Sequence, residues 1–142
     1  MLGPFPEFET LYADGSTRSL AYHAACVEAE GYGRWTRIRE IAELAGRMSY
    51  LHLGVAHCPD TDREAGLAAS YLRRRGFDVV LPDGADDCDP VGQADRFRKR
   101  ATEFNVIAGM CVGHDALFIR HSGAPVTSLV VRDLRLRHNP VA

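Results

Sequence analysis

Three of the four cysteines follow segments whose composition predicts buried β-strands. They are Cys58, Cys88 and Cys111. A thiolate is the form of cysteine that binds zinc or an iron–sulfur cluster, and it is also the nucleophile of cysteine enzymes. No CxxC pair occurs, so the usual signature of a zinc ribbon or a thioredoxin-like motif is missing. Any shared chemistry of these thiols therefore depends on a fold that brings them together.

Strands and helices are predicted to alternate after residue 49. A capping box at 61–64 predicts one helix start, and Asp89 followed by Pro90 predicts another. Such alternation implies right-handed crossovers and a parallel sheet that helices cover on both faces. We therefore predict a three-layer α/β fold, Rossmann- or flavodoxin-like, with a four-stranded and mainly parallel sheet. The expected strands are 50–57, 77–81, 104–110 and 126–131, and the expected helices between them are 61–76, 89–103 and 114–121.

The part of the chain before residue 49 is predicted to be helical. Residues 16–30 place apolar side chains on one face and stop at Gly31, a residue typical of a helix end. Thr36 is a suitable N-cap for a second helix, which should run to about residue 48. We interpret residues 1–142 as one domain, with a helical part at 1–48 and a sheet part at 49–142.

The three later cysteines are all expected at one edge of this sheet. Ligands of parallel sheets bind beyond the carboxyl ends of the strands, and neighbouring strands lie roughly 5 Å apart. Each cysteine also precedes a predicted helix, whose free N–H groups stabilise a thiolate. We therefore predict that Cys58, Cys88 and Cys111 ligate a metal centre, with a [4Fe–4S] cluster preferred and zinc as the alternative. Three ligands leave one position open, as in catalytic sites.

Two histidines and two glycines flank the predicted metal site. His57 and His114 are candidates for a fourth ligand or for proton transfer, although each is equally well explained as an ordinary exposed or hydrogen-bonded histidine. Gly109 and Gly113 border a strand-to-helix turn that could cradle an anion or cofactor. This turn lacks the lysine of a nucleotide-binding loop, so a nucleoside triphosphatase is not expected.

Two other functions stay open at this point. In the first, Cys111 is the nucleophile of a metal-free enzyme, with His114 nearby. In the second, the domain is a non-catalytic module that holds an anion or nucleotide at the same edge. The substrate or redox partner is not identified by the residues.

Further polar groups are expected to have ordinary structural roles. Cys26 lies within a predicted helix and is expected to be buried in the hydrophobic core of the protein. The acid-rich loop after the second strand is expected to be a solvated turn with helix caps, and the basic tail a solvated face. The loop acids are Asp83, Asp86, Asp87 and Asp89, and the tail residues are Arg132, Arg135, Arg137 and His138.

Composition narrows the class of protein. A chain of 142 residues with 46% hydrophobic and 25% charged residues can bury a normal core. The formal charge of −2 gives no general attraction to nucleic acid or to anionic membranes. Neither a signal peptide nor a membrane-spanning run is evident, so we expect a soluble cytoplasmic protein. A homodimer is the expected oligomer on general grounds.

Three stretches of the sequence together resemble a known family. They are CDPVGQAD at 88–95, FNVIAGMCVGHDALFIRHSGAPVTSLVV at 104–131 and HNPVA at 138–142. They are similar to the uncharacterised prokaryotic family called domain of unknown function eighteen forty-seven, whose members are often labelled metal-binding. The stretches LYADG, EGYGRWTRIREIAELA and LGVAHC between residues 11 and 58 match the less distinctive amino-terminal half of that family.

The resemblance implies roles for the residues that match the family pattern. Two departures matter, because members often carry an amino-terminal cysteine cluster and further cysteines after the second strand, where this chain has Leu81–Gly84. The resemblance names no reaction. The residues carried over are Cys58, Cys88, Cys111, Gly113, His114, Asp115, His138 and Asn139.

Overall fold

The computed structural model describes residues 10–83, 88–139 and 141. The chain divides into two compact units, Met1–Ser49 and Tyr50–Ala142. The first unit contains helices α2 (Gly15–Gly31) and α3 (Arg37–Arg47). Thr36 caps α3 as predicted, because its hydroxyl accepts a hydrogen bond from the Arg39 backbone N–H.

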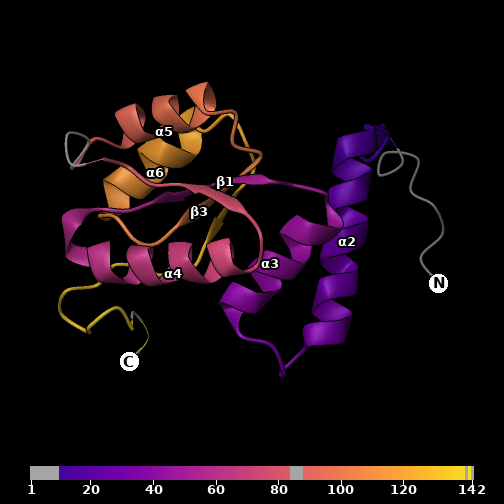
Figure 1. Ribbon diagram of the computed structural model, residues 1–142, viewed down its shortest axis with the longest axis horizontal. Helices are drawn as coiled ribbons and strands as arrows, with labels where there is room; N and C mark the ends of the chain where they lie inside the picture. Colours follow the sequence, from indigo (N-terminus) through magenta and orange to yellow (C-terminus); the bar gives the residue numbers. More distant parts are fainter. Residues whose placement is uncertain (1–9, 84–87, 140, 142) are drawn as a thin grey trace. The chain divides into compact units, whose positions relative to one another are not determined.

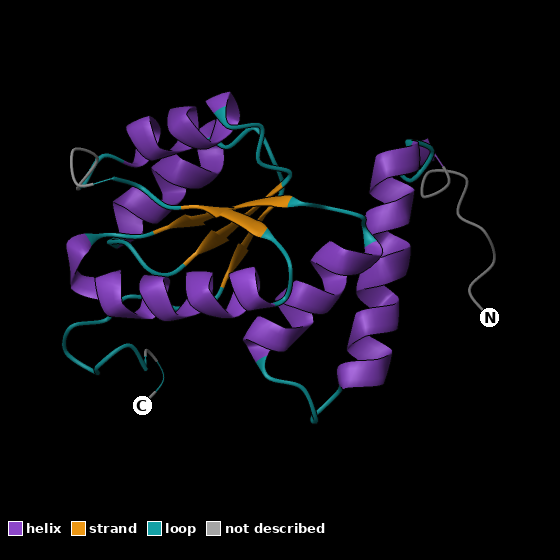
Figure 2. Ribbon diagram, in the orientation of Figure 1, coloured by secondary structure: helices purple, strands orange, loops and turns teal. Residues whose placement is uncertain are grey.

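The second unit alternates strands and helices (Figures 1 and 2). A 3₁₀ turn, η1, separates the first strand from the first helix. Asp89 caps α5 and Pro90 is its first residue, as predicted. The elements are β1 (His52–Ala56), η1 (Pro59–Thr61), α4 (Asp62–Arg74), β2 (Asp78–Val80), α5 (Pro90–Lys99), β3 (Phe104–Ile107), α6 (Val112–His121) and β4 (Val126–Ser128).

The four strands form one sheet in the order β2-β1-β3-β4, and every pair is parallel. Helix α4 lies on one face of the sheet, and α5 and α6 lie together on the other (Figure 1). This arrangement confirms the predicted α/β fold with a parallel sheet. The order of the first three strands, 2-1-3, is that of flavodoxin-like folds, in which the chain reverses direction across the sheet between β1 and β3.

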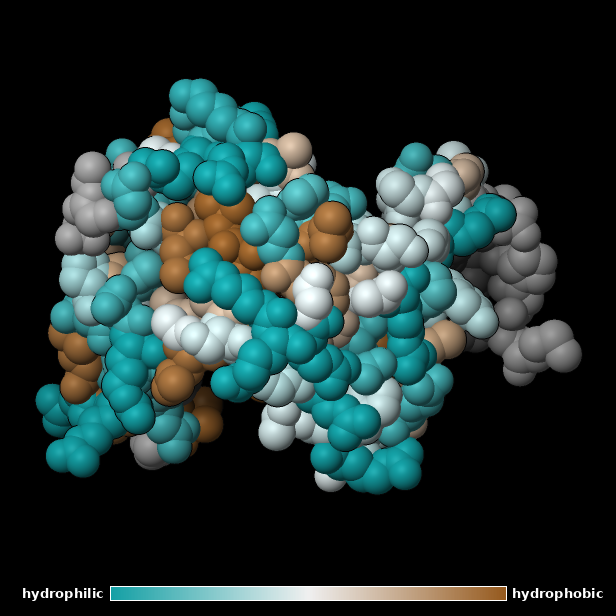
Figure 3. All heavy atoms as spheres, viewed as in Figure 1, coloured by the Kyte–Doolittle hydropathy of each residue, from teal (hydrophilic) through white to brown (hydrophobic). Residues whose placement is uncertain are grey.

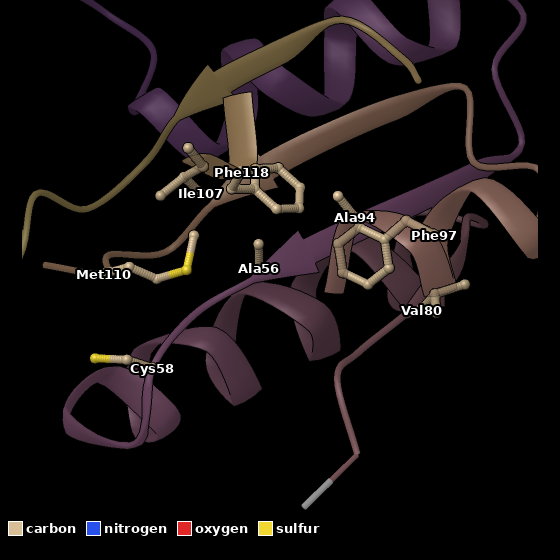
Figure 4. Packing of buried hydrophobic residues seen from close by; sticks show 8 residues of the cluster. All are labelled: Ala56, Cys58, Val80, Ala94, Phe97, Ile107, Met110 and Phe118. Carbon is tan, nitrogen blue, oxygen red and sulfur yellow. The ribbon is translucent and has the colours of Figure 1, made fainter. Parts of the chain in front are cut away.

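An aromatic cluster fills the space between the sheet and the α5–α6 layer. Phe97 of α5 and Phe118 of α6 pack edge to face, with ring centroids 5.8 Å apart. Gly54 of β1 lies directly beneath Phe97, where any larger residue would collide with the ring. Figure 4 shows these rings with Ile107 and Met110 of the same cluster. In Figure 3, hydrophilic residues cover the outer sides of α4 and α5, as expected for helices with one buried face.

The strands are shorter than predicted, and several helix ends differ from the expected ones. Strand β1 stops at Ala56 and β3 stops at Ile107, because the chain leaves the sheet to form the connections to the helices. Helix α6 begins at Val112, two residues before the expected start, whereas α5 ends at Lys99 instead of continuing to 103. None of the helices in the described part of the chain combines the length and apolar character that a membrane span requires.

Glu103 fastens the other edge of the sheet, where β1 begins. Its Oε1 accepts hydrogen bonds from the backbone N–H groups of Leu51 at 2.8 Å and His52 at 3.2 Å. These bonds lower the pKa of the Glu103 carboxyl group. A carboxylate whose pKa is lower in the folded state adds stability at neutral pH and loses that contribution as pH falls through the folded pKa.

We expect Glu103→Gln to lower the free energy of unfolding by about 0.5–1 kcal/mol at pH 7, since solvent screens this partly exposed group. The difference from wild type should shrink as pH falls through the lowered folded pKa of Glu103, because the native carboxyl then becomes protonated as well. Urea unfolding at several pH values measures both effects. Glu28→Gln, on the exposed side of α2, is the matched control. An equal loss in the two variants would contradict the role given to Glu103.

Candidate functional site

Cys58 and Cys111 lie beyond the carboxyl ends of β1 and β3, on either side of the point where the strand order reverses. The two segments of the chain that follow β1 and β3 stay hydrogen-bonded to each other after the regular strands end. The Ala108 N–H donates to the Ala56 carbonyl at 2.8 Å, and the Cys58 N–H donates to the Gly109 carbonyl at 3.1 Å. The fold thus brings these two cysteines to neighbouring positions at one edge, which is where ligands of such sheets bind.

Gly109 is the residue around which this edge is packed. Its φ of +100° is a conformation that favours glycine, and an added Cβ would lie 3.1 Å from the Thr61 methyl and 3.3 Å from the backbone of Arg132. The Thr61 hydroxyl donates to the Gly109 carbonyl at 2.7 Å. In the structure, Gly109 allows three chain segments to approach one another closely. Its predicted role in holding a cofactor stays a prediction.

Thr61 has a different role from the predicted one. Its fully buried hydroxyl bonds to the carbonyls of Gly109 and Cys58 and makes no capping bond to α4. The capping-box prediction was therefore wrong in mechanism, although α4 begins at Asp62 as it implied. The hydroxyl is used to tie the end of β1 to the end of β3.

The two cysteines differ in accessibility. Cys58 is buried, and its sulfur lies 3.9 Å from Asp60 Oδ2 and 4.0 Å from Thr61 Oγ1. Figure 4 places it at the end of the core cluster, near Met110. Cys111 is partly exposed and occupies the N-cap position of α6, where its side chain makes no capping bond. Helix N-termini stabilise anions, so this position suits a thiolate.

Arg132 joins the site from beyond β4. Its Nε and Nη2 donate to Asp60 Oδ2 at 2.9 and 2.6 Å. The Asp60 carboxylate, and to a smaller extent the charges of Cys58 and Cys111, raise the pKa of the guanidinium above its usual value. Arg132 thus departs from the solvated face expected of the basic tail, because its side chain is only 22% exposed and pairs with a carboxylate that follows another strand.

The segment after β4 positions Arg132, because backbone hydrogen bonds hold this segment on the end of β3. The N–H groups of Leu129 and Val130 both donate to the Ile107 carbonyl, at 2.8 and 3.3 Å, so the chain beyond β4 stays on the end of β3. Residues from the ends of three strands therefore meet at one point.

His57 is held in place by hydrogen bonds, but none of those in the described part of the chain joins it to a cysteine side chain. Its Nε2 lies 3.1 Å from Asp62 Oδ1, and its backbone N–H and carbonyl both bond to the side-chain amide of Gln93. The other ring nitrogen, Nδ1, is buried and has no hydrogen-bond partner among the described residues. A role for His57 in proton transfer stays a prediction.

Cys88 differs from the other two thiols in its surroundings. It is exposed and has a φ of +57°, immediately before the Asp89 cap of α5. Within residues 10–83 and 88–139, no group of three or more His, Cys, Asp or Glu side chains is close enough to hold a metal ion. Cys26, in α2 of the first unit, is only partly buried.

His114 and Gly113 belong to the first turn of α6, which Asp115 anchors. Asp115 Oδ1 accepts from the Met110 N–H at 3.0 Å, and its own N–H donates to the Cys111 carbonyl at 2.9 Å. Burial raises the pKa of Asp115, and the bond from Met110 acts in the opposite direction. Gly113 has open space where a side chain would be, so packing does not require glycine there.

His138 stabilises a turn in the carboxyl-terminal segment. Its Nδ1 accepts a hydrogen bond from the Asp133 N–H at 3.0 Å, which assigns the ring proton to Nε2. The tail is thus partly folded onto itself next to Arg132. Asp86 and Asp87 of the acid-rich loop lie outside the described residues, whereas Asp83 pairs with Arg96.

Several of the residues that build this edge were not predicted from the sequence. Asp60, Gln93 and Thr61 are polar residues close in sequence to a cysteine or a helix start, and such positions usually indicate turns or caps. The available signal was the family-like stretch at 88–95, which contains Gln93. Arg132 could not be distinguished from the other basic residues around it.

The fold and the site define a flavodoxin-like α/β protein with two thiols and a guanidinium at its switch point. The family described as "Protein of unknown function (DUF1847)" matches residues 5–81 and 83–129, and this chain belongs to it. An uncharacterised protein of Methanocaldococcus jannaschii is 32% identical in an alignment of length 148 that covers 90% of this chain and 76% of the relative.

The hydrogen bond from Met110 to Asp115 can be tested with an isosteric pair. We expect Asp115→Ala to lower the free energy of unfolding by about 1–2 kcal/mol, because it leaves the buried Met110 N–H without its acceptor. Asp115→Asn keeps an acceptor oxygen and removes a half-buried charge, so its stability should stay within about 0.5 kcal/mol of wild type. Urea unfolding measures both, and equal losses in the two variants would contradict this role.

Proposed function

We propose that the protein binds a thiophilic metal centre at the edge of β1 and β3, with Cys58 and Cys111 as its fixed ligands. The observation that carries this proposal is that a cysteine follows each of the two strands at the switch point. The charges of both sulfur atoms also contribute to the raised pKa of Arg132. Soft thiolate ligands select zinc, copper(I) and iron–sulfur clusters over hard cations.

The donor chemistry of the two cysteines fits such a centre, but among the residues that the structure describes no third protein ligand is in place. Cys88 is the candidate, since it precedes α5 at the same carboxyl edge of the sheet. The first turns of α5 are tied to the end of β1 by the Gln93 amide. A [4Fe–4S] cluster or a three-cysteine zinc site requires the Cys88 thiol to move toward the other two. A two-thiolate site requires no such movement.

The surrounding residues would stabilise thiolates and control access. Arg132 supplies a positive charge that pairs with Asp60, whose Oδ2 lies 3.9 Å from the Cys58 sulfur. Thr61 fixes the backbone that carries Cys58. A bound metal would supply an open position for a substrate atom or a redox partner. His114, in the first turn of α6, is the proposed proton donor nearest in sequence to Cys111.

Metal analysis of protein purified without oxygen is the test. We expect bound iron with visible absorption, or bound zinc without colour, and we expect Cys58→Ser and Cys111→Ser each to weaken metal binding at least about tenfold. Cys26→Ser, in the other unit, is the control and should bind metal normally. Cys88→Ser distinguishes a three-cysteine centre from a two-thiolate centre. Protein that is free of these metals and does not take them up on reconstitution would rule out the proposal.

The partial exposure of Cys111 favours a second candidate, a metal-free cysteine nucleophile. The N-cap position and the nearby guanidinium are the surroundings in which reactive thiols are found. In this case substoichiometric iodoacetamide should modify Cys111 before Cys58, and Cys58→Ser and Cys88→Ser should leave that reaction within about twofold of wild type. Peptide mass spectrometry measures the sites, and preferential labelling elsewhere would exclude this candidate.

A further inference from the structure

The way in which Arg132 is held and paired with Asp60 suits a residue that binds a ligand. We propose that Arg132 is the specificity-determining residue of the site and that it receives the carboxylate or other oxyanion of a small anionic ligand approaching the two thiols. This inference rests on the proposed function in one respect only, namely that ligands bind at the edge of β1 and β3.

The position of Arg132 is fixed by close packing. Its backbone N and Cβ both lie 3.3 Å from the place that a side chain on Gly109 would occupy. The preceding residues Leu129 and Val130 are bonded to the end of β3. The guanidinium is therefore presented by a well-packed backbone, as expected for a residue that selects a ligand.

The partner of Arg132 is suited to being displaced. Both hydrogen bonds go to one oxygen, Oδ2 of Asp60, although a guanidinium prefers the paired oxygens of a carboxylate or phosphate. The Asp60 side chain is 47% exposed and that of Arg132 is 22% exposed. An ion pair of this kind contributes little net stability, so an incoming anion can replace Asp60 at small cost.

The charges around Arg132 specify the class of ligand. The guanidinium donates to Asp60 Oδ2, and the same oxygen lies 3.9 Å from the Cys58 sulfur. The charges of Cys58 and Cys111 also contribute to the raised pKa of Arg132. An oxyanion bound to Arg132 would bring its neighbouring atoms next to the thiols, whereas a neutral or cationic ligand would gain nothing from the guanidinium. The site is thus matched to a small organic acid with a group that reacts with, or bridges to, sulfur.

Two alkylating reagents of nearly equal size test this charge selection. Iodoacetate is an anion and iodoacetamide is neutral, and with either one the thiolate attacks the methylene carbon and iodide leaves. In full-length, chelator-treated protein, mass spectrometry gives the ratio of the two rates at Cys111. We expect Arg132→Gln to lower the iodoacetate to iodoacetamide ratio about fivefold and Asp60→Asn to raise it. The ratio cancels any change in thiolate fraction, which alters both rates alike.

Exposed Cys88 is the internal control, and its ratio should be the same in all variants. Wild-type protein provides a second measurement if Arg132→Gln does not fold, because the ratio at Cys111 should fall toward that of free glutathione as salt increases from about 0.02 to 0.5 M. A ratio at Cys111 that equals that of glutathione and does not respond to salt would overturn the proposal. The result is independent of metal content, so failure of the metal proposal is read separately.

Discussion

The pairing of the chain segments just beyond β1 and β3 is the constraint on which the site depends. One backbone hydrogen bond, from Cys58 to Gly109, continues the parallel ladder after both strands have ended. The Thr61 hydroxyl reinforces it by bonding to the Gly109 carbonyl. Because Gly109 carries no side chain, the segment that bears Arg132 can lie against the same point. Two thiols and a guanidinium therefore share one edge without any direct link between them.

This constraint separates the three cysteines that the sequence places at strand ends. Cys58 and Cys111 belong to segments that are bonded to each other, whereas Cys88 belongs to the approach to α5. The Gln93 amide bonds to both the N–H and the carbonyl of His57, so α5 is nevertheless attached next to Cys58. Membership of a family of unknown function assigns no reaction, and the chemistry must be inferred from these contacts.

The sequence was sufficient to predict the fold because its strongest signals are periodic and local. Alternating apolar segments, Asp89 with Pro90, and Thr36 each correspond to an element or cap in the structure. The site was predicted in part, since strand ends locate Cys58 and Cys111 but say nothing of contacts between distant residues. Arg132 and Asp60 are 72 residues apart, and neither has a local pattern that indicates its partner. Thr61 misled for a related reason, because a threonine before a helix usually caps it.

The two hydrogen bonds between the Gln93 amide and the His57 backbone limit the substitutions that the fold can tolerate. A primary amide carries a carbonyl acceptor and an NH2 donor group side by side, as a peptide group carries C=O and N–H. Gln93 uses one bond of each kind to take the place of a neighbouring strand beside His57. Glutamate lacks the donor, asparagine is one methylene shorter, and an aliphatic residue offers neither polar atom. Few substitutions of the buried Gln93 are therefore expected to be tolerated. The reason is that the backbone polar groups of His57 need hydrogen-bond partners.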